Sequence, residues 1–270
     1  MGALRVTQSM MVARSLSDLN TQTRRLLKLQ EQLSSGLKVN NPSDDPLAAR
    51  RAVNIRATMA KHEQYLANVS STSSLLTESA TSLQTVITAL QRAHTLALQG
   101  STGTNSQDQM NQIAIEVNQL LESTFVEANH QTNQRYVFGG TRTMSPPFVA
   151  TRNANGEIAS VSYEGNDDPI SISVADGISV KINESGQDAF QSTQDIFQTL
   201  IDIRDNLRSG DKTSLGGTRL TELKDAQNQL LVSLASIGAT QNRMETLTNN
   251  MEEYIQQLKL ALSDNIDADY

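Results

Sequence analysis

The sequence contains no cysteine and no tryptophan among its 270 residues. Without cysteine the chain can form neither a disulfide nor a thiolate metal site, which suits an extracellular protein whose subunits must not cross-link. Aromatic residues are also scarce, at five tyrosines and five phenylalanines, and most of them lie between Phe125 and Phe197. We therefore expect aromatic packing in the middle of the chain rather than near its ends.

Long hydrophobic runs and long basic runs are absent as well. The longest apolar stretches span only a few residues, so the sequence predicts neither a transmembrane helix nor the hydrophobic segment of a cleavable signal peptide. The formal net charge is −7, and the densest basic groups, near Arg24 and Arg50, are too sparse for a nucleic-acid footprint. We therefore expect no membrane insertion and no nucleic-acid partner.

The chain is rich in apolar residues at alternating spacings of three and four. One such pattern runs from Ile55 to Ala97 without proline or glycine, and a second runs from Leu220 to Leu262. A weaker one opens the chain and includes Val12, Leu16, Leu19, Leu26, Leu33 and Leu37. This periodicity predicts long helices, each with a narrow apolar stripe that must pack against another helix. Any stripe left unpaired within the chain must bind another molecule.

The segment between the first two helical patterns has the residues of a helix end followed by a helix start. Gly36 is a C-cap candidate with positive φ, and Pro42 stops the first helix. Ser43 and Asp44 are N-cap candidates for the next helix, the Asp44–Asp45 pair can act at the helix start through caps and the dipole, and Pro46 suits a first helical turn. We expect Gly36, Pro42, Asp44, Asp45 and Pro46 to act as a hinge and cap.

The sequence divides into four expected segments. Residues 1–42 form an N-terminal assembly helix, and residues 43–140 form the first half of a helical bundle, with its third helix reaching Gln134. Residues 141–186 form a small β-rich outer domain, in which the alternation from Glu157 to Ile182 predicts two to four antiparallel strands with serines facing water. Residues 187–270 form the second half of the bundle, with a helix at 187–209, a glycine-rich loop at 210–217 and the start of a C-terminal assembly helix.

No catalytic, metal or cofactor site emerges from the sequence. Ser35 to Lys38 match the Ser-x-x-Lys pattern of penicillin-recognising enzymes, but the partner motifs are missing. His62 and His94 are too far apart on one expected helix to share a metal, and the turn at 166–169 lacks the ligand spacing of a calcium loop. We therefore predict that the protein is not an enzyme and binds no cofactor or metal.

Motifs at both ends and in the middle resemble those of one protein family. The segment LSSGLKVNNPSDDP (33–46) and the segments GATQNR (238–243) and DNIDADY (264–270) are similar to the terminal signatures of bacterial flagellins. The element RYVFGG (135–140) resembles the hook-associated protein 3 branch of that family. The resemblance covers nearly the whole chain. It implies an elongated, mainly α-helical antiparallel bundle with a small outward β domain, acting as a structural subunit at the junction between hook and filament.

The resemblance also implies partners and a location. Copies of the chain would form a ring or helical homo-oligomer, with hook-associated protein 1 on the hook side and flagellin on the filament side. A flagellar export chaperone would bind before type III secretion, which uses no cleavable signal peptide, and the mature protein would be extracellular. Family members continue beyond a DADY-like motif, so we expect the end at Tyr270 to be a truncation and Met1–Leu4 to be vector-derived.

The resemblance and the apolar stripes together predict an assembly surface. We expect it to include Val12, Leu16, Leu19, Leu26, Leu33, Leu37, Ile255, Leu258 and Leu262.

Two alternatives to the junction role remain open at this point. The first is the filament flagellin itself, although filament flagellins often carry larger outer domains. The second belongs to a different class, a coiled-coil signalling or scaffold protein, which would need neither the RYVFGG element nor the β-rich segment. A type III translocator would require an apolar hairpin long enough to enter a bilayer, and the sequence has none.

Overall fold

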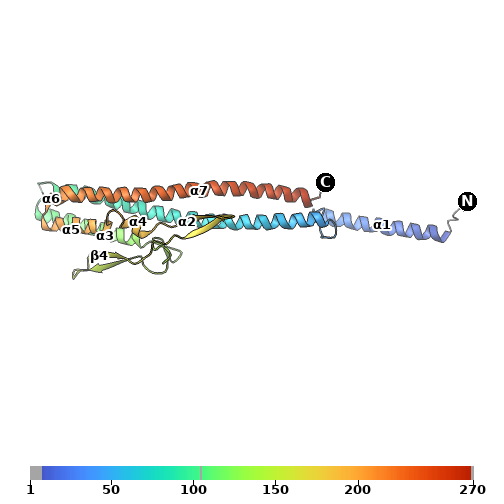
Figure 1. The fold of residues 1–270 in the computed structure, drawn as a ribbon, viewed down its shortest axis with the longest axis horizontal. Coiled ribbons are helices and arrows are strands. Elements are labelled where there is room, and N and C mark those ends of the chain that lie inside the picture. Colours follow the sequence, from blue (N-terminus) through green and yellow to red (C-terminus); the bar gives the residue numbers. More distant parts are fainter. Residues whose placement is uncertain (1–7, 104, 269–270) are drawn as a thin grey trace. The chain divides into compact units, whose positions relative to one another are not determined.

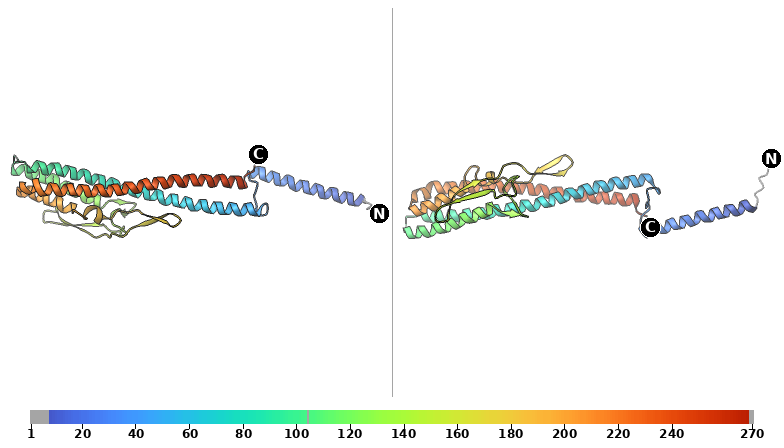
Figure 2. Two further views of the ribbon diagram at one scale, coloured as in Figure 1. Left: turned by 45° about the horizontal axis from the view of Figure 1, so that its top comes forward. Right: turned by 90° about the horizontal axis from the view of Figure 1, so that it is seen from below.

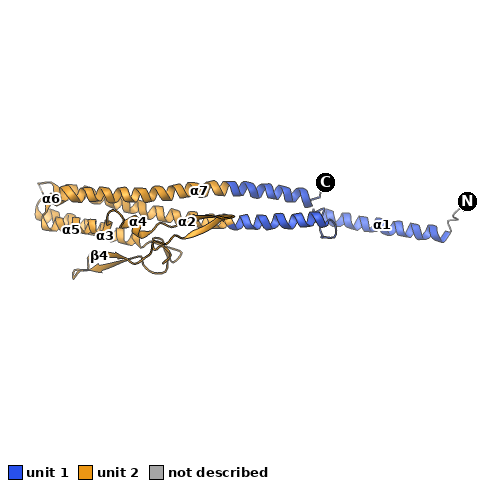
Figure 3. Cartoon of the chain, viewed as in Figure 1, with its two compact units in different colours: residues 1–64, 250–270 blue, residues 65–249 orange. Residues whose placement is uncertain are grey.

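The computed structural model of the chain describes residues 8–103 and 105–268 (Figure 1). The described residues are mainly α-helical with three small two-stranded sheets, which confirms the predicted fold class. The chain separates into two compact units (Figure 3): unit 1 comprises residues 1–64 and 250–270, and unit 2 comprises residues 65–249. This division differs from the four segments expected from the sequence. The expectations for Met1–Leu4 and for Tyr270 lie outside the described residues.

Helices account for both halves of the chain around a central β region. They are α1 Gln8–Ser35, α2 Pro46–Ser101, α3 Gln107–Ala128, α4 Gly186–Phe190, α5 Ile196–Ser209, α6 Lys212–Ser214, the π-helical turn η1 Leu215–Arg219, and α7 Leu220–Ile266. Local chemistry fixes several helix ends. Ser106 and Gln109 form a capping box at the start of α3, and Gly210, with φ of 76°, ends α5.

The strands form three antiparallel hairpins. Their members are β1 Gln131–Thr132, β2 Arg135–Tyr136, β3 Phe148–Arg152, β4 Ile158–Tyr163, β5 Ser171–Ala175 and β6 Ile178–Lys181, paired in sequence order. Figure 2 shows them lying on one side of the unit 2 helices. The stretch predicted to alternate, from Glu157 to Ile182, therefore contains three of the strands.

Two expected boundaries are wrong. The third helix ends at Ala128 rather than at Gln134, because Asn133 and Gln134 adopt φ values of 50° and 62° and close the β1–β2 hairpin. The expected glycine-rich loop at 210–217 is mostly helical, since α6 and η1 lead directly into α7. Glycine there produces a wider helical turn instead of a loop.

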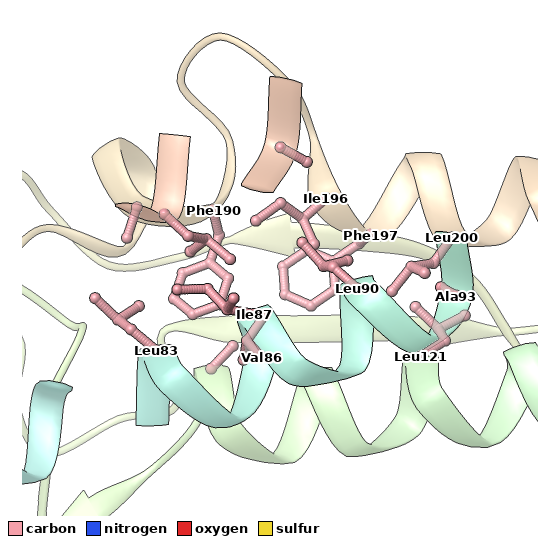
Figure 4. Packing of buried hydrophobic residues seen from close by; sticks show 14 of the residues in the cluster. Leu83, Val86, Ile87, Leu90, Ala93, Leu121, Phe190, Ile196, Phe197 and Leu200 are labelled. Carbon is pink, nitrogen blue, oxygen red and sulfur yellow. The ribbon is translucent and has the colours of Figure 1, made fainter. Parts of the chain in front are cut away.

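The core of unit 2 is built where three helices meet. Leu83 and Leu90 of α2, Leu121 of α3 and Leu200 of α5 are fully buried, and Figure 4 shows them converging from the three helices. Buried Leu223 and Leu230 add the start of α7 to the same hydrophobic cluster. The apolar stripes read from the sequence thus satisfy one another within unit 2, as helix packing requires.

An aromatic cluster ties the strands to this helical core. The ring of Phe148 in β3 lies 5.2 Å from those of Tyr163 and Phe197 and 5.3 Å from that of Phe190. Ile158 of β4 is also fully buried. The β-rich segment expected as an outer domain therefore also supplies core side chains, Phe148 and Ile158.

A buried arginine reinforces the same connection. The Arg204 side chain of α5 is 3% exposed and donates from Nη1 to the Ile158 carbonyl at 2.7 Å and to Asn118 Oδ1 at 3.0 Å. Its Nε atom pairs with Asp205 at 2.8 Å. A buried guanidinium is tolerated only when its donors are satisfied, so Arg204 fixes β4 against α3 and α5.

Within the described residues, none of the helices combines the length and apolar character needed to cross a membrane.

Candidate assembly surface

Helix α1 exposes the apolar stripe predicted from the sequence. No residue of α1 is buried, and Val12, Leu16, Leu19, Leu26 and Leu33 are each 55% to 65% exposed. Met10, Met11, Leu27 and Leu29 add further exposed apolar surface to the same helix. Single exposed leucines are ordinary, but a continuous apolar set of this length marks a surface that binds another molecule.

The C-terminal half of the predicted surface lies differently. Ile255 is buried inside unit 1, so its assignment to an intermolecular surface is wrong. The reason is that α7 keeps its apolar stripe against the chain itself in this unit, where Met251 and Ile266 are buried as well. Leu37, Leu258 and Leu262 are partly buried.

A short irregular segment, residues 36–45, connects α1 to α2. Gly36 has φ of 71° and its N–H donates to the Gln32 carbonyl at 2.8 Å, the geometry of a glycine that ends a helix. Residues 41–44 then form a β-turn closed by the Asp44 N–H and the Asn41 carbonyl at 2.9 Å. Pro42 occupies the second position of that turn, where its fixed φ is favourable.

The two adjacent aspartates have separate tasks. Asp45 Oδ1 accepts the backbone N–H groups of Leu47 at 3.0 Å and Ala48 at 2.9 Å, so Asp45 caps α2, and Pro46 begins the helix. Asp44 Oδ2 accepts the backbone N–H of Asn41 at 3.0 Å, and Asp44 Oδ1 lies 2.9 Å from Lys28 Nζ. The Lys28 ammonium, followed by the Asn41 N–H, lowers the pKa of the Asp44 carboxyl below its ordinary 3.8.

The segment before Asp44 pairs with the end of the described chain. Leu37 and Asp267 form an antiparallel bridge, the Lys38 N–H donates to the Ile266 carbonyl at 2.7 Å, and the Ala268 N–H donates to the Gly36 carbonyl at 2.9 Å. The two terminal motifs that carry the family resemblance are thus in direct contact. Sequence reasoning identified both motifs but not their pairing, because nothing local in either segment encodes the other.

Potential metal ligands in the described residues are not clustered. No three histidine, aspartate or glutamate side chains there are grouped as a metal site would require. His130 lies 3.3 Å from Glu78, and the His62 ring packs edge-on against Tyr254 at 4.8 Å. These are packing and surface contacts. The arrangement can present an apolar helix, fix the turn that follows it, and pack against other proteins.

Comparison with known proteins gives the family. Residues 6–143 match the bacterial flagellin N-terminal helical region. The chain is 26% identical to flagellar hook-associated protein 3 of Salmonella typhimurium over 292 residues, which cover 99% of this chain and 89% of the relative. Flagellin of Bacillus subtilis is 24% identical over 277 residues, covering 98% of this chain and 88% of the relative.

Solved structures share the fold. A candidate flagellar hook-associated protein from Vibrio parahaemolyticus gives a TM-score of 0.75 at 19% identity, covering 83% of this chain and 100% of that one. The flagellar junction protein of Legionella pneumophila gives a TM-score of 0.66 at 15% identity, covering 80% of this chain and 99% of that one. The match to the bacterial flagellin N-terminal region covers residues 6–143, more than half of this chain, and the chain therefore belongs to the bacterial flagellin family.

Proposed function

We propose that this chain is the structural subunit that joins the hook to the filament of the bacterial flagellum. The similarity to hook-associated protein 3 over 99% of the chain favours this role over that of the filament flagellin. The RYVFGG element (135–140) and the small β region between β3 and β6 point the same way. The role is one of packing, without catalysis, metal or cofactor.

The observation that carries the proposal is the unpaired apolar stripe of α1. Each of its five predicted residues keeps more than half of its surface in water. Burying this exposed surface against a neighbour contributes about 1 kcal/mol per side chain, so the five side chains together contribute about 5 kcal/mol to docking. Assembly and ordering of α1 then occur together, and the free subunit stays soluble for export.

The partners follow from this position in the flagellum. Copies of the chain pack side by side in a ring, hook-associated protein 1 lies on the hook side, and flagellin docks on the filament side. An export chaperone binds the chain before it leaves the cell through the type III channel, and the assembled protein is extracellular. In this arrangement Val12, Leu16, Leu19, Leu26 and Leu33 contact neighbouring subunits, and the exposed parts of Leu37, Leu258 and Leu262 extend the surface.

A complementation experiment tests the proposal. Cells lacking the gene receive the wild-type chain, a stripe variant (Leu19→Ala with Leu26→Ala) or a control variant (Thr21→Ala with Arg24→Ala). The control positions lie about 160° around the helix from the two leucines and replace exposed residues with the same strong helix former. Electron microscopy scores filaments, and immunoblotting measures flagellin in the medium.

We expect hooks without filaments and flagellin in the medium from the deletion strain and from cells with the stripe variant. The wild-type chain and the control variant restore filaments. Filaments in the deletion strain would contradict the junction role. Labelling of this chain along the whole filament, instead of at its base, would support the alternative that it is the filament flagellin. Retention of the chain in the cytoplasm supports the scaffold alternative, and full rescue by the stripe variant rules out the assigned α1 surface.

A further inference from the structure

The outward side of α2 in unit 1 is basic and partly apolar. Ala48 and Ala52 are buried on its inner side, and Arg50 lies about 160° around the helix from each of them. Arg50 and Lys61 are both exposed, and their separation of 11 residues, about three helical turns, places them on the same side. Val53 lies between them and is 62% exposed. We name Arg50, Val53 and Lys61 the basic face.

The outward side of α7 in unit 1 has the same layout with the opposite charge. Ile255 is buried on the inner side, and Asp264 lies about 180° around the helix from it. Glu253 and Asp264 are exposed and are again 11 residues apart. Leu260 lies between them and is 68% exposed. We name Glu253, Leu260 and Asp264 the acidic face.

The inner sides of the two helices already contact each other within unit 1. Asn265 Nδ2 of α7 donates to the Ala48 carbonyl of α2 at 2.7 Å, and the ring of Tyr254 lies 4.8 Å from that of His62. The order of these contacts shows that α2 and α7 run antiparallel there (Figure 3). Only the outward sides are left to bind another molecule.

The charges of the two helices are separated rather than mixed. Residues 46–64 contain four arginine or lysine side chains and one carboxylate, whereas residues 250–268 contain four carboxylates and one lysine. In the part of the chain that the structure describes, Arg50, Glu253 and Asp264 form no ion pair. These three charges are therefore available to a partner of opposite charge.

We propose that the basic face of one copy of the chain docks on the acidic face of the next copy. Both faces are present on every copy, and their charges have the same spacing. In a ring whose helices run along its axis, α2 of one copy lies antiparallel to α7 of the next. Arg50 then pairs with Asp264 of the next copy and Lys61 with Glu253, and the apolar side chains meet between these pairs. Because two different faces meet, the contact repeats from copy to copy and builds a ring or a helix.

Apolar surface and charge contribute differently to this contact. Covering Val53 and Leu260 removes apolar surface from water and favours association. Surface ion pairs stabilise weakly, but like charges at a contact reject a wrong partner or register. The contact forms between assembled copies, so it does not require unit 1 to be ordered in the free chain. It rests on the proposed function only for the ring in which the copies are placed.

Charge reversal in cells that lack the gene tests the contact. Arg50→Glu brings two carboxylates together between copies, and Asp264→Arg brings two cations together. Cells receive either single variant, the double variant, or both single variants from two genes. Arg56→Glu and Glu252→Arg are the matched controls, because both residues are exposed and lie about 120° around their helices from the tested residues. Electron microscopy counts filaments, immunoblotting measures each variant in the medium, and circular dichroism confirms its helical content.

Each single reversal should reduce the number of filaments at least about tenfold, while the controls keep them, because like charges strongly disfavour a contact. The double variant should restore filaments. The mixture of Arg50→Glu and Asp264→Arg chains should restore them too, since opposite charges again meet between different copies. Single reversals without effect would overturn the proposal. So would rescue by the double variant alone, which indicates a pair within one chain, or no rescue at all, which indicates a partner with unchanged charges.

Cross-linking detects the contact independently of the junction role. The natural sequence has no cysteine, so Val53→Cys and Leu260→Cys chains made in one cell each carry a single thiol. A membrane-permeant bifunctional maleimide should join them into a dimer in the mixture and not in cells with either variant alone. Equal dimer from one variant alone, or none from the mixture, contradicts docking of these faces. Filaments in the deletion strain would remove the junction role, whereas the dimer would still report contact between copies.

Discussion

Replacing Phe148 with alanine tests whether the β region belongs to the core of unit 2. The side chain is 1% exposed and its ring contacts those of Tyr163, Phe190 and Phe197 at about van der Waals distance. Truncating a fully buried phenylalanine costs about 3 to 5 kcal/mol, because the transfer free energy of the ring is lost and a cavity remains. We expect a loss of about 4 kcal/mol, a large part of the stability of an ordinary domain.

The assay is urea denaturation followed by helical circular dichroism, with the midpoint and slope compared between variants. Helical signal is the informative probe, because Phe148 itself is in a strand and affects helices only through the aromatic cluster. Val149→Ala is the matched control, since the neighbouring side chain is 46% exposed, and we expect it to cost less than about 1 kcal/mol. A comparable small loss for Phe148→Ala would refute the reasoning and show that the strands fold apart from the helices.

Three further predictions concern other parts of the chain. Replacing residues 145–184 with a Gly/Ser linker should lower the melting temperature sharply, because it removes Phe148 and leaves a buried Arg204 donor without the Ile158 carbonyl; an unchanged melt would contradict this. Arg208 lowers the pKa of Glu157 from 4.5 to about 2, so this carboxylate stabilises the fold above about pH 4.5 and loses that effect as the pH falls toward 2. The full shift corresponds to a stabilisation of about 3 kcal/mol, and partial exposure of the pair reduces this to about 1 to 2 kcal/mol. Comparing the free energy of unfolding of Arg208→Gln and the wild type as a function of pH measures this contribution. Gly36→Val places a β-branched residue at φ of 71° and should impair motility complementation with a nearly unchanged melting temperature, whereas equal losses in both would not fit.

The long helices were predictable because their signal is repeated many times. The apolar spacing from Ile55 to Ala97 continues over many helical turns without proline or glycine, and α2 indeed spans Pro46–Ser101. The break between α4 and α5 was missed, although Asp195 caps α5 by accepting the Gln198 N–H. The polar stretch before α5 contains a single cap residue, which is a weak signal between two segments with helical patterns. The break is evident only in the folded structure, where Phe190 of α4 and Phe197 of α5 pack in one cluster.

The turn after α1 separates what local rules can predict from what they cannot. Gly36 and Asp45 act within three or four residues of themselves, so local rules place a C-cap at Gly36 and an N-cap just before Pro46, although the named candidates were Ser43 and Asp44 and the residue that accepts the helix N–H groups is Asp45. The Lys28–Asp44 pair and the pairing of residues 36–39 with 266–268 join positions distant in sequence, and no spacing rule connects them. Aromatic packing in the middle of the chain was predicted from the sequence, but the contacts of Phe148 with Tyr163, Phe190 and Phe197 depend on the fold in the same way.

Mutations in unit 2 and in α1 should have different effects, because side chains are buried in unit 2 and exposed in α1. Unit 2 buries leucines of three helices together with Phe148 and Ile158, so substitutions there act on folding whether or not the protein is assembled. No residue of helix α1 is buried, so removing its leucines should cost the free chain little stability. Removing these leucines should then weaken the complex in which another molecule covers them. A subunit that folds by itself and binds its neighbours afterwards requires this separation, because a helix already buried in its own core would have no free surface left for assembly.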